Sequence, residues 1–392
     1  MSNKIKLGII GNGNMGSAHL KNIKEGKCPN IEVVALADIN PQKLEKAKAL
    51  YGDSLTYFED AIEMLDSGII DSCIIAVPHY DHTRYAIECL KREIHVMVEK
   101  PAGVFTKQVK EMNEEAKKHP NTCFAMMFNQ RTNCIYRKLR ELVQSGKYGQ
   151  IRRTNWIITN WYRSQFYYDS GDWRATWSGE GGGVLLNQAP HQLDLWQWIC
   201  GMPVKVQTQM HFGKWHNIEV EDDVTTYVEY ENGATGVFIT TTGDAYGTNR
   251  FEIQMDKAKF VCENDKLMGW EYEMTEQEYS ATSKNGFASV PRKEMVIETD
   301  GENPQHVGVM NAFADNILFG KPLIAEGYEG INGLTLSNAM HLSAFLNKEI
   351  KLPFDDELYY EELMKRVATS KKKDVVNTAD TIDIGDTFAG SK

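Results

Sequence analysis

The sequence lacks the features of a membrane, secreted or nucleic-acid-binding protein. Its 392 residues contain no apolar run near the ~18 that a membrane helix needs, and the short apolar stretch at the N-terminus is too rich in glycine for a signal peptide. The seven cysteines form no C-x-x-C pair, so we expect no disulfide framework, no metal site and a reducing, cytoplasmic setting. A net charge of −11 disfavours nucleic acid and anionic membranes as partners.

The composition that remains is that of an ordinary globular protein, with 42% hydrophobic and 25% charged residues. In roughly the first third of the chain, short apolar runs rich in β-branched residues alternate with helix-like stretches. This alternation predicts βαβ repetition and a parallel sheet that is covered on both faces. The predicted strands are 6–10, 33–37, 73–77, 95–98 and 123–128, and the predicted helices are 41–51, 83–92 and 107–119.

After residue 150 the pattern changes, and predicted strands follow one another at 151–160, 204–212, 224–230, 235–242 and 251–255. Asn232 and Gly233 stand between two of them and predict a hairpin. Helices are expected near 187–200, 305–319 and 328–347, and a last one ends near 368. We therefore predict an α/β domain over 1–127 with a doubly wound parallel sheet, and an α+β domain over 128–369 with a large, mostly antiparallel open sheet. The tail, 370–392, is expected to be mobile or to pack on a partner subunit.

A glycine-rich loop separates the first predicted strand from a helix. Gly11, Gly13 and Gly16 have G-x-G-x-x-G spacing, which permits a tight turn, close approach of a pyrophosphate and close helix packing. The helix N-terminus also points N–H groups at phosphates. An ordinary glycine-rich turn is the alternative, but the strand–loop–helix context favours a Rossmann dinucleotide site. Its predicted residues are Gly11, Asn12, Gly13, Asn14, Met15 and Gly16.

Asp38 ends the second predicted strand, where an acid can accept a hydrogen bond from the ribose 2′-hydroxyl. Its charge also repels a 2′-phosphate, and Lys43 is the nearest cation that could bind one. We therefore predict NAD as the cofactor in preference to NADP.

The strand at 95–98 runs into Glu99, Lys100 and Pro101. Ligands of doubly wound sheets lie at the carboxyl ends of the strands, so Lys100 is expected near the nicotinamide. Pro101 restricts Lys100 to an extended conformation and raises the odds of a cis bond. A lysine held there could polarise a substrate hydroxyl and stabilise a developing alkoxide. The alternative is a solvated ion pair at a strand end.

Several motifs in a fixed order resemble the glucose–fructose oxidoreductase/inositol dehydrogenase (Gfo/Idh/MocA) family over about residues 4–366. They are GIIGNGNMG, AVPHYDHTRYA, VMVEKPAG, GGGVLLNQAPHQLDLWQW and EGYEGINGLTLSNAMHLSAFL. The resemblance implies that Pro78 and His82 line the nicotinamide site, that Glu99 and Lys100 flank it, and that Lys100 contacts the reacting hydroxyl. For His82, a solvent-facing position at a helix start is the alternative.

The helix near 187–200 carries the best candidate for a catalytic base, His191. Because Pro190 belongs in a first helical turn, the helix should start close to Asn187 and leave His191 near its positive end as neutral imidazole. The resemblance places the family's catalytic histidine here, and a buried structural histidine is the alternative. Many members have Asp where this chain has Asn187, which can orient a hydroxyl or cap the helix but cannot take a proton. Asp194, on the same helical face as His191, could orient the imidazole or make a domain contact.

Residues 156–177 hold four of the eight tryptophans and predict a sugar pocket, with an oligomer interface as the alternative or as a second role. Tyr162, Arg163, Trp173 and Arg174 are the expected pocket contacts, because aromatic faces suit a pyranose ring and arginine bonds its polar rim. The stretch is similar to family members that oxidise C3 of glucosides and anhydrosugars. Asn129, Arg131 and His306 are weaker candidates, each with a structural alternative of equal weight.

Together these patterns predict an NAD-dependent sugar dehydrogenase. His191 would take the hydroxyl proton, Lys100 would stabilise the alkoxide and Asn187 would orient the ring. One alternative is an inositol (cyclitol) dehydrogenase. Another is an NAD-retaining enzyme that uses transient oxidation for glycoside elimination or epimerisation. A third, an NAD-responsive regulatory protein, is disfavoured by the presence of Lys100 and His191. The broad second sheet also predicts a homo-oligomer, either a dimer, a tetramer or a hexamer.

Overall fold

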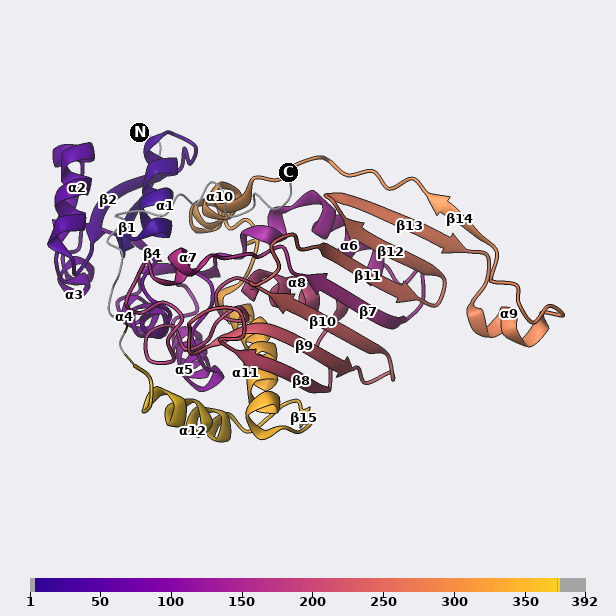
Figure 1. Ribbon diagram of the computed structural model, residues 1–392. Coiled ribbons are helices and arrows are strands. Elements are labelled where there is room, and N and C mark those ends of the chain that lie inside the picture. Colours follow the sequence, from indigo (N-terminus) through magenta and orange to yellow (C-terminus); the bar gives the residue numbers. More distant parts are fainter. Residues whose placement is uncertain (1–3, 372, 374–392) are drawn as a thin grey trace.

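The computed structural model describes residues 4–371 and 373, and it arranges them around two β-sheets (Figure 1). The first sheet has six parallel strands in the order β3-β2-β1-β4-β5-β6. This confirms the predicted doubly wound α/β unit. Its strands are β1 (Ile5–Ile10), β2 (Ile31–Ala37), β3 (Thr56–Phe58), β4 (Ser72–Ile75), β5 (His95–Val98) and β6 (Phe124–Met126). Its helices are α1 (Asn14–Lys24), α2 (Pro41–Tyr51), α3 (Ala61–Asp66), α4 (His82–Lys91) and α5 (Thr106–Lys118).

The second sheet has nine strands in the order β14-β13-β12-β11-β7-β10-β9-β8-β15. They are β7 (Ile151–Ile158), β8 (Lys205–Phe212), β9 (Glu221–Glu229), β10 (Thr235–Thr241), β11 (Asn249–Met255), β12 (Ala258–Glu263), β13 (Lys266–Tyr272), β14 (Arg292–Met295) and β15 (Ile350–Lys351). The pairing is antiparallel except between β7 and β10, which run parallel, so the sheet is mixed and mostly antiparallel. The hairpin predicted at Asn232-Gly233 joins β9 to β10, and Gly233 takes the positive φ of 81° that the turn requires.

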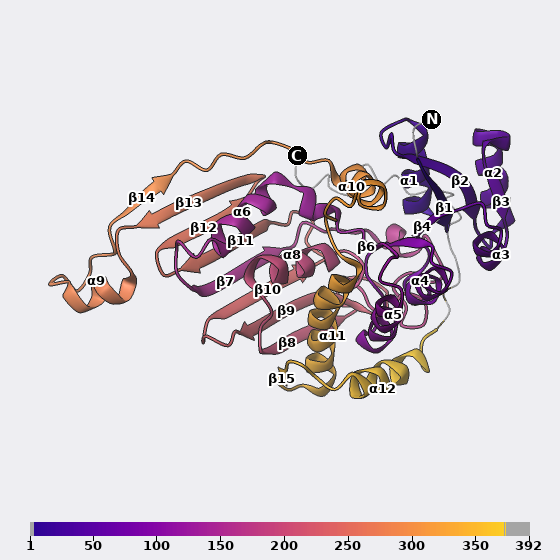
Figure 2. The same cartoon turned by 180° about the vertical axis from the view of Figure 1, so that it is seen from behind.

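The remaining helices are α6 (Cys134–Gln144), α7 (Gln165–Tyr168), α8 (Pro190–Cys200), α9 (Glu276–Thr282), α10 (Gln305–Phe319), α11 (Gly330–Leu346) and α12 (Asp356–Val367). Helices α6, α8 and α11 lie across one face of the second sheet, and the other helices lie beyond its edges or nearer the first sheet (Figure 2). Helix α8 docks through Trp196, whose ring stacks on Phe238 of β10 at 5.3 Å and whose Nε1 donates to Thr154 of β7. A second stack, Trp156 on Phe251 at 4.2 Å, continues this aromatic core. The helix that carries His191 is therefore fixed to the sheet by large buried side chains.

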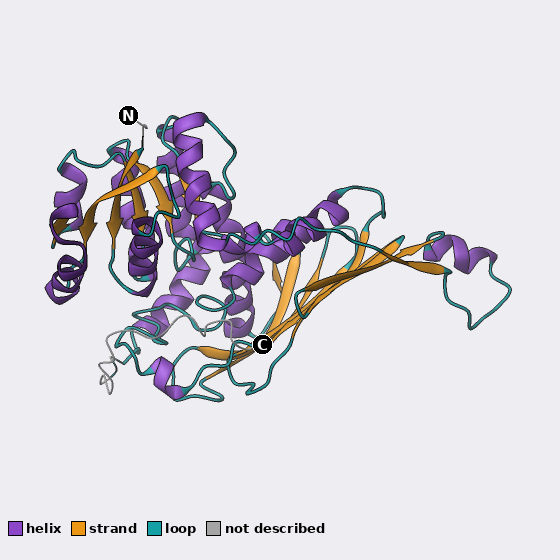
Figure 3. Ribbon diagram, turned by 90° about the horizontal axis from the view of Figure 1, so that it is seen from above, coloured by secondary structure: helices purple, strands orange, loops and turns teal. Residues whose placement is uncertain are grey.

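Helix α10 crosses back to the first sheet. Val309, Met310 and Phe313 belong to the same buried cluster as Leu7 and Ile9 of β1. A segment predicted for the second domain thus completes the core of the first (Figure 3). The domain boundary at residue 127 stays a prediction.

Two further expectations concern the chain's surroundings and its end. No helix within residues 4–371 is both long and apolar enough to cross a membrane. The predicted tail, 370–392, falls almost wholly outside the described residues. Of its first residues, Ser370 donates a hydrogen bond from Oγ to Glu219 at 2.6 Å.

Candidate active site

The glycine loop between β1 and α1 has the shape that a dinucleotide needs. Gly11 has φ +95°, and a Cβ there would lie 2.4 Å from the carbonyl oxygen of Ala76. A Cβ on Gly16 would meet the carbonyl oxygen of Gly11 at 1.9 Å, whereas one on Gly13 would meet nothing within 4 Å. Gly11 therefore makes the turn, Gly16 lets helix and strand touch, and Gly13 leaves its side open to a ligand.

Three polar features beside this loop also fit a bound dinucleotide. Helix α1 begins without a side-chain cap and without an acidic residue in its first turn, so its N–H groups remain available to phosphates. Asn12 Oδ1 is buried and has no hydrogen-bond partner among the described residues. Asp38, at the end of β2, accepts from the backbone N–H of Asn12 at 2.7 Å and of Asn40 at 2.9 Å. Its carboxylate thus lies beside the loop, with Lys43 Nζ at 3.7 Å.

Glu99 is turned toward α1. His19 Nε2 lies 2.6 Å from Glu99 Oε1, and the N–H of Lys100 donates to Oε2 at 3.1 Å. Although burial opposes ionisation, the hydrogen bond from His19 and nearby positive charge lower the pKa of Glu99 to about 2. Glu99 is therefore an anion that anchors the backbone before Lys100. The sequence interpretation missed His19, which carries no motif signal.

Lys100 reaches from the end of β5 to the loop before α8. Its Nζ donates to the backbone carbonyl of Asn187 at 2.9 Å, and the Lys100–Pro101 bond is cis. Burial lowers the pKa of Lys100, with Arg174 and Arg163 acting in the same direction and Glu99 and Glu180 opposing them. One ammonium hydrogen is thus committed to the protein, which leaves two for a ligand.

Pro78 and His82 lie at the end of the loop that follows β4. His82 is 1% exposed, so the solvent-facing alternative is wrong. Its Nδ1 lies 2.6 Å from the Pro101 carbonyl oxygen and its Nε2 lies 2.8 Å from that of Val77. His82 therefore ties this loop to the segment after Lys100. The neighbouring His79, which the sequence interpretation missed, lies with its ring 5.8 Å from that of His82 and 6.1 Å from that of Trp173.

Helix α8 begins at Pro190, and its N-cap residue is Ala189. The expected start near Asn187 is therefore too early, and Asn187 does not cap the helix. His191 lies in the first turn, as predicted. It is 7% exposed, and its Nδ1 has no hydrogen-bond partner among the described residues. Burial, together with the positive charge of Lys100, holds the pKa of His191 well below its ordinary value, so the imidazole is neutral and can accept a proton.

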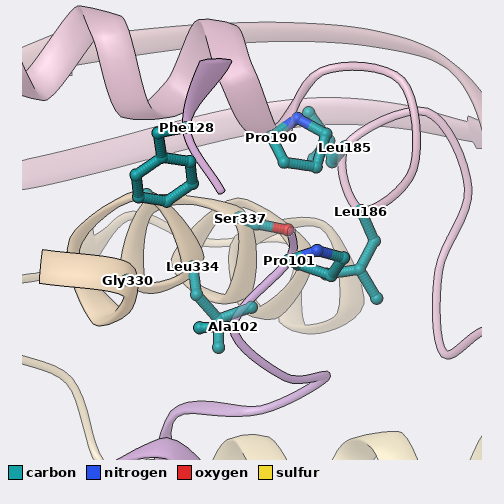
Figure 4. A pocket seen from close by; sticks show the side chains of 10 residues that line it. Pro101, Ala102, Phe128, Leu185, Leu186, Pro190, Gly330, Leu334 and Ser337 are labelled. Carbon is teal, nitrogen blue, oxygen red and sulfur yellow. The ribbon is translucent and has the colours of Figure 1, made fainter. Parts of the chain in front are cut away.

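Lys100 and His191 are brought together by their proline neighbours. Pro101 and Pro190 line the same small apolar cavity between the two loops and α11 (Figure 4). The other residues around it are Ala102, Phe128, Leu185, Leu186, Gly330, Gly333, Leu334 and Ser337. Tight apolar packing behind both functional residues therefore fixes the segments that carry them.

Asp194 does not orient His191. Its carboxylate is taken by Arg131, which donates from Nε at 2.8 Å and from Nη2 at 2.7 Å. Arg131 also pairs with Glu329, so its guanidinium is occupied within the protein. Both Asp194 and Arg131 are structural in this arrangement, which agrees with the alternatives considered for them.

Asn187 is held by a residue that the sequence interpretation missed. Its Nδ2 donates to Glu180 Oε1, and Glu180 Oε2 accepts from the N–H of Ala175 at 2.6 Å. Glu180 is 1% exposed, and burial raises its pKa, an effect opposed by Arg174 and the two hydrogen bonds. Glu180 stands directly before the Gly-Gly-Gly run of the catalytic motif, and this position was the only available signal.

Most of the tryptophans in 156–177 form core structure. Trp156, Trp161 and Trp177 are buried, whereas Trp173 is half-buried and faces His79. Tyr162 is 49% exposed, and its backbone carbonyl accepts a hydrogen bond from Arg163 at 2.9 Å. Fewer aromatic side chains of this stretch are therefore open to a ligand than its tryptophan content suggested.

A smaller group from this segment does point toward Lys100. Arg174 stacks between Tyr167 and Trp173, at 4.4 and 4.6 Å from the ring centroids. It donates to the Tyr167 hydroxyl at 2.6 Å, and Gln188 donates to the same oxygen at 3.1 Å. Because both donors occupy that oxygen, the hydroxyl hydrogen of Tyr167 is left to donate outward. Arg163 lies 5.2 Å from the same ring.

His306 and Asn129 meet near His19. The ring of His306 lies 5.5 Å from that of His19, and burial lowers the pKa of His306 to about 4. Asn129 Nδ2 donates to Gln305 Oε1 at the start of α10. Asn129 therefore joins the 3₁₀ turn at Asn129–Thr132 to α10, and its substrate role stays a prediction.

Comparisons with known proteins agree with this geometry. Residues 5–127 match the model of the oxidoreductase family with an NAD-binding Rossmann fold, and residues 136–261 match the GFO/IDH/MocA C-terminal domain. Myo-inositol 2-dehydrogenase of Thermotoga maritima is 23% identical over 89% of this chain and 98% of its own length. Glucose-6-phosphate 3-dehydrogenase of Bacillus subtilis is 30% identical over 37% of this chain and 40% of its own.

Two solved structures share the fold. The WlbA dehydrogenase of Chromobacterium violaceum, in complex with NADH and UDP-GlcNAcA, has a TM-score of 0.77 and 26% identity over 90% of this chain and 97% of its own. Levoglucosan dehydrogenase, in complex with NADH, has a TM-score of 0.73 and 19% identity over 90% of this chain and all of its own.

The chain belongs to the GFO/IDH/MocA oxidoreductase family. It is an NAD-binding oxidoreductase, and the predicted fold class, family and cofactor are confirmed.

Proposed function

We propose that this oxidoreductase is a dehydrogenase of ring secondary alcohols, acting on a pyranoside, with C3 of a glucoside or anhydrosugar favoured. The observation that carries the proposal is the meeting of three side chains at one place. Lys100 Nζ donates a hydrogen bond to the backbone carbonyl of Asn187. His191, in the first turn of α8, is a buried neutral imidazole. A cation, an amide and a base are the groups that oxidation of an alcohol requires.

The residues of 1–127 would hold the cofactor, and those of 128–369 the substrate. Gly11 to Gly16 and the N-terminus of α1 would bind the pyrophosphate, and Asp38 the ribose. NAD, when bound, supplies the capacity to accept hydride. His191 takes the proton of the substrate hydroxyl, and Lys100 donates to the oxygen that becomes negative. Asn187, Tyr167 and Arg174 hold neighbouring hydroxyls and so orient the ring.

A cyclitol is the second candidate substrate. The relative that spans nearly the full chain, from Thermotoga maritima, is a myo-inositol 2-dehydrogenase. An inositol carries a run of secondary hydroxyls like that of a pyranose, and Lys100, Asn187 and Arg174 can form hydrogen bonds with hydroxyls on either ring.

The test is a panel of myo-inositol, scyllo-inositol, levoglucosan, methyl glucosides and glucose 6-phosphate with NAD, followed by NADH absorbance and product analysis. We expect at least one pyranoside or cyclitol to yield a ketone and stoichiometric NADH. Release of an aglycone without net NADH would favour the NAD-retaining alternative. Absence of turnover with every ring alcohol, in protein that binds NAD, would contradict the proposal.

A further inference from the structure

Glu180 is a buried carboxylate whose two oxygens have different partners. Oε2 accepts from the backbone of Ala175, and Oε1 accepts from the side-chain amide of Asn187. Arg174 Nη1 lies 3.9 Å from Oε1. The two hydrogen bonds fix the direction of the carboxylate, because one partner is backbone and the other lies in the same loop.

This contact decides which end of the Asn187 amide faces away from Glu180. Asn187 donates from Nδ2 to Glu180 Oε1, so the nitrogen of the amide faces the carboxyl group and Oδ1 faces away from it. The carbonyl of the same residue is held by Lys100 at 2.9 Å, so both the backbone and the side chain of Asn187 are constrained. Oδ1 accepts no hydrogen bond from the described residues, so it remains as a free acceptor on the residue whose backbone carbonyl binds Lys100.

We propose that Glu180 is a positioning residue that fixes Asn187 with Oδ1 toward the substrate, so that the enzyme requires a free hydroxyl on the carbon next to the reacting one. The inference rests on the proposed function, in which Lys100 holds the reacting oxygen. Because Lys100 also bonds Asn187, the groups that these two residues contact are neighbours on the ring. An acceptor at Oδ1 selects a hydroxyl that can donate, and it rejects a methoxy group or a hydrogen there.

The test moves the carboxylate from position 180 to position 187 and the amide from position 187 to position 180. In E180Q, the new amide must accept from Ala175 through its oxygen and therefore presents its NH₂ to Asn187, which turns Oδ1 away from the substrate. In N187D, two carboxylates meet in a buried site. In E180Q/N187D, the new amide donates to the new carboxylate, and the second carboxylate oxygen is again free for the substrate.

We expect N187D to lower the melting temperature by several degrees and E180Q/N187D to recover most of that loss, a readout that needs no substrate. With levoglucosan or myo-inositol, whichever the unmodified enzyme oxidises, E180Q should raise KM roughly 10-fold with a smaller change in kcat. The double variant should return KM to within about 3-fold of the starting value. An analogue of that substrate with a methylated oxygen on the carbon next to the reacting one should have a kcat/KM at least ~100-fold lower than the substrate itself. In E180Q, this ratio between substrate and analogue should be smaller.

Glu221→Gln is the matched control. Glu221 is an equally buried carboxylate that accepts from the N–H groups of Gly183 and Leu185 in the same loop, without contact to the Asn187 side chain. Besides burial, the charge of Glu221 raises the pKa of Glu180, and Glu221 also pairs with His341 at 3.0 Å. Combined with N187D, E221Q should therefore recover much less of the loss than E180Q does, because it supplies no amide to the new carboxylate.

The inference is overturned if E180Q/N187D is no better than the worse single variant, or if E221Q rescues N187D equally well. If the unmodified enzyme oxidises no ring alcohol, the proposed function fails and the substrate requirement fails with it. If the unmodified enzyme oxidises a ring alcohol but E180Q/N187D does not recover the losses of the single variants, only the proposed role of Glu180 is overturned.

Discussion

At the scale of single residues, the candidate site depends on hydrogen bonds that hold its functional side chains in place. Lys100, Asn187 and His191 stand in recognisable strings, and the structure brings their segments together. Glu180 and His19 act through single hydrogen bonds to Asn187 and Glu99, and no spacing in the sequence reports such a contact.

Asp194 is a further residue whose hydrogen-bond partner the sequence spacing did not identify. Asp194 lies three residues after His191 and shares its helical face, as predicted. A buried carboxylate, however, forms its hydrogen bonds with the partner that binds it most strongly. That partner is Arg131, which comes from a distant turn and binds it with two hydrogen bonds.

His191 is expected to be the base. The change His191→Ala should lower kcat by ~10²–10⁴-fold, which is the usual contribution of general base catalysis, while NAD still binds. The pKa of His191 is held well below its ordinary value by burial and positive charge. Activity should therefore persist as pH falls through about 6.5, the ordinary histidine value, and be lost only at lower pH, where the imidazole becomes protonated. The measurement is a profile of kcat and kcat/KM against pH.

Asn187→Ala serves as the comparison for that variant. Because Asn187 orients and does not ionise, its loss should act mainly on KM and leave the acidic limb in place. An unchanged kcat and an unchanged acidic limb in the His191 variant would show that another group takes the proton.

At the scale of elements, the parallel sheet was predicted more completely than the mixed one. Strands such as β1 and β5 are distinctive because nearly all of their residues are apolar and buried, with both faces of the first sheet covered. Strands β12 and β13 escaped prediction because charged residues interrupt their apolar pattern, as at Lys259 and Glu271. Asn264 and Asp265, both with positive φ, form the turn between them, and this Asn-Asp pair was the signal that could have located the hairpin.

The Arg131–Asp194 pair joins α8 to the turn after β6 and should be important for stability. Both side chains are almost fully buried, at 2% and 1% exposure. Arg131→Ala leaves Asp194 buried without its cation, so the free energy of unfolding should fall by about 3–5 kcal/mol. Denaturant unfolding followed by fluorescence would measure the change. The double replacement R131A/D194A should cost less than the sum of the two single ones, and simple additivity would contradict a direct pair.

At the scale of the whole molecule, the helices of the described residues that lie across the nine-stranded sheet do so on one face, and none of them covers the other face (Figure 3). The side chains that face α6, α8 and α11 are buried, as with Phe238 and Trp156. Their neighbours on the same strands point the other way: Ile239 and Val237 are half-buried, and Tyr227 is 40% exposed. In adjacent strands Ile239 pairs with Ile157 and Val237 pairs with Tyr227, so apolar side chains from three strands form a patch on this face.

A patch of this kind on a broad sheet favours association between copies, because a second sheet face can bury it and cyclic symmetry then closes the assembly. We expect a dimer or a larger closed oligomer in sedimentation equilibrium. Ile239→Lys places a charge in the middle of the patch and should shift the mass toward that of one chain. Leu50→Lys, at an exposed position on α2 far from the sheet, makes the same chemical change and should leave the mass unaltered. A single-chain mass for the unmodified protein would contradict the prediction, and equal effects of the two variants would place the contact elsewhere.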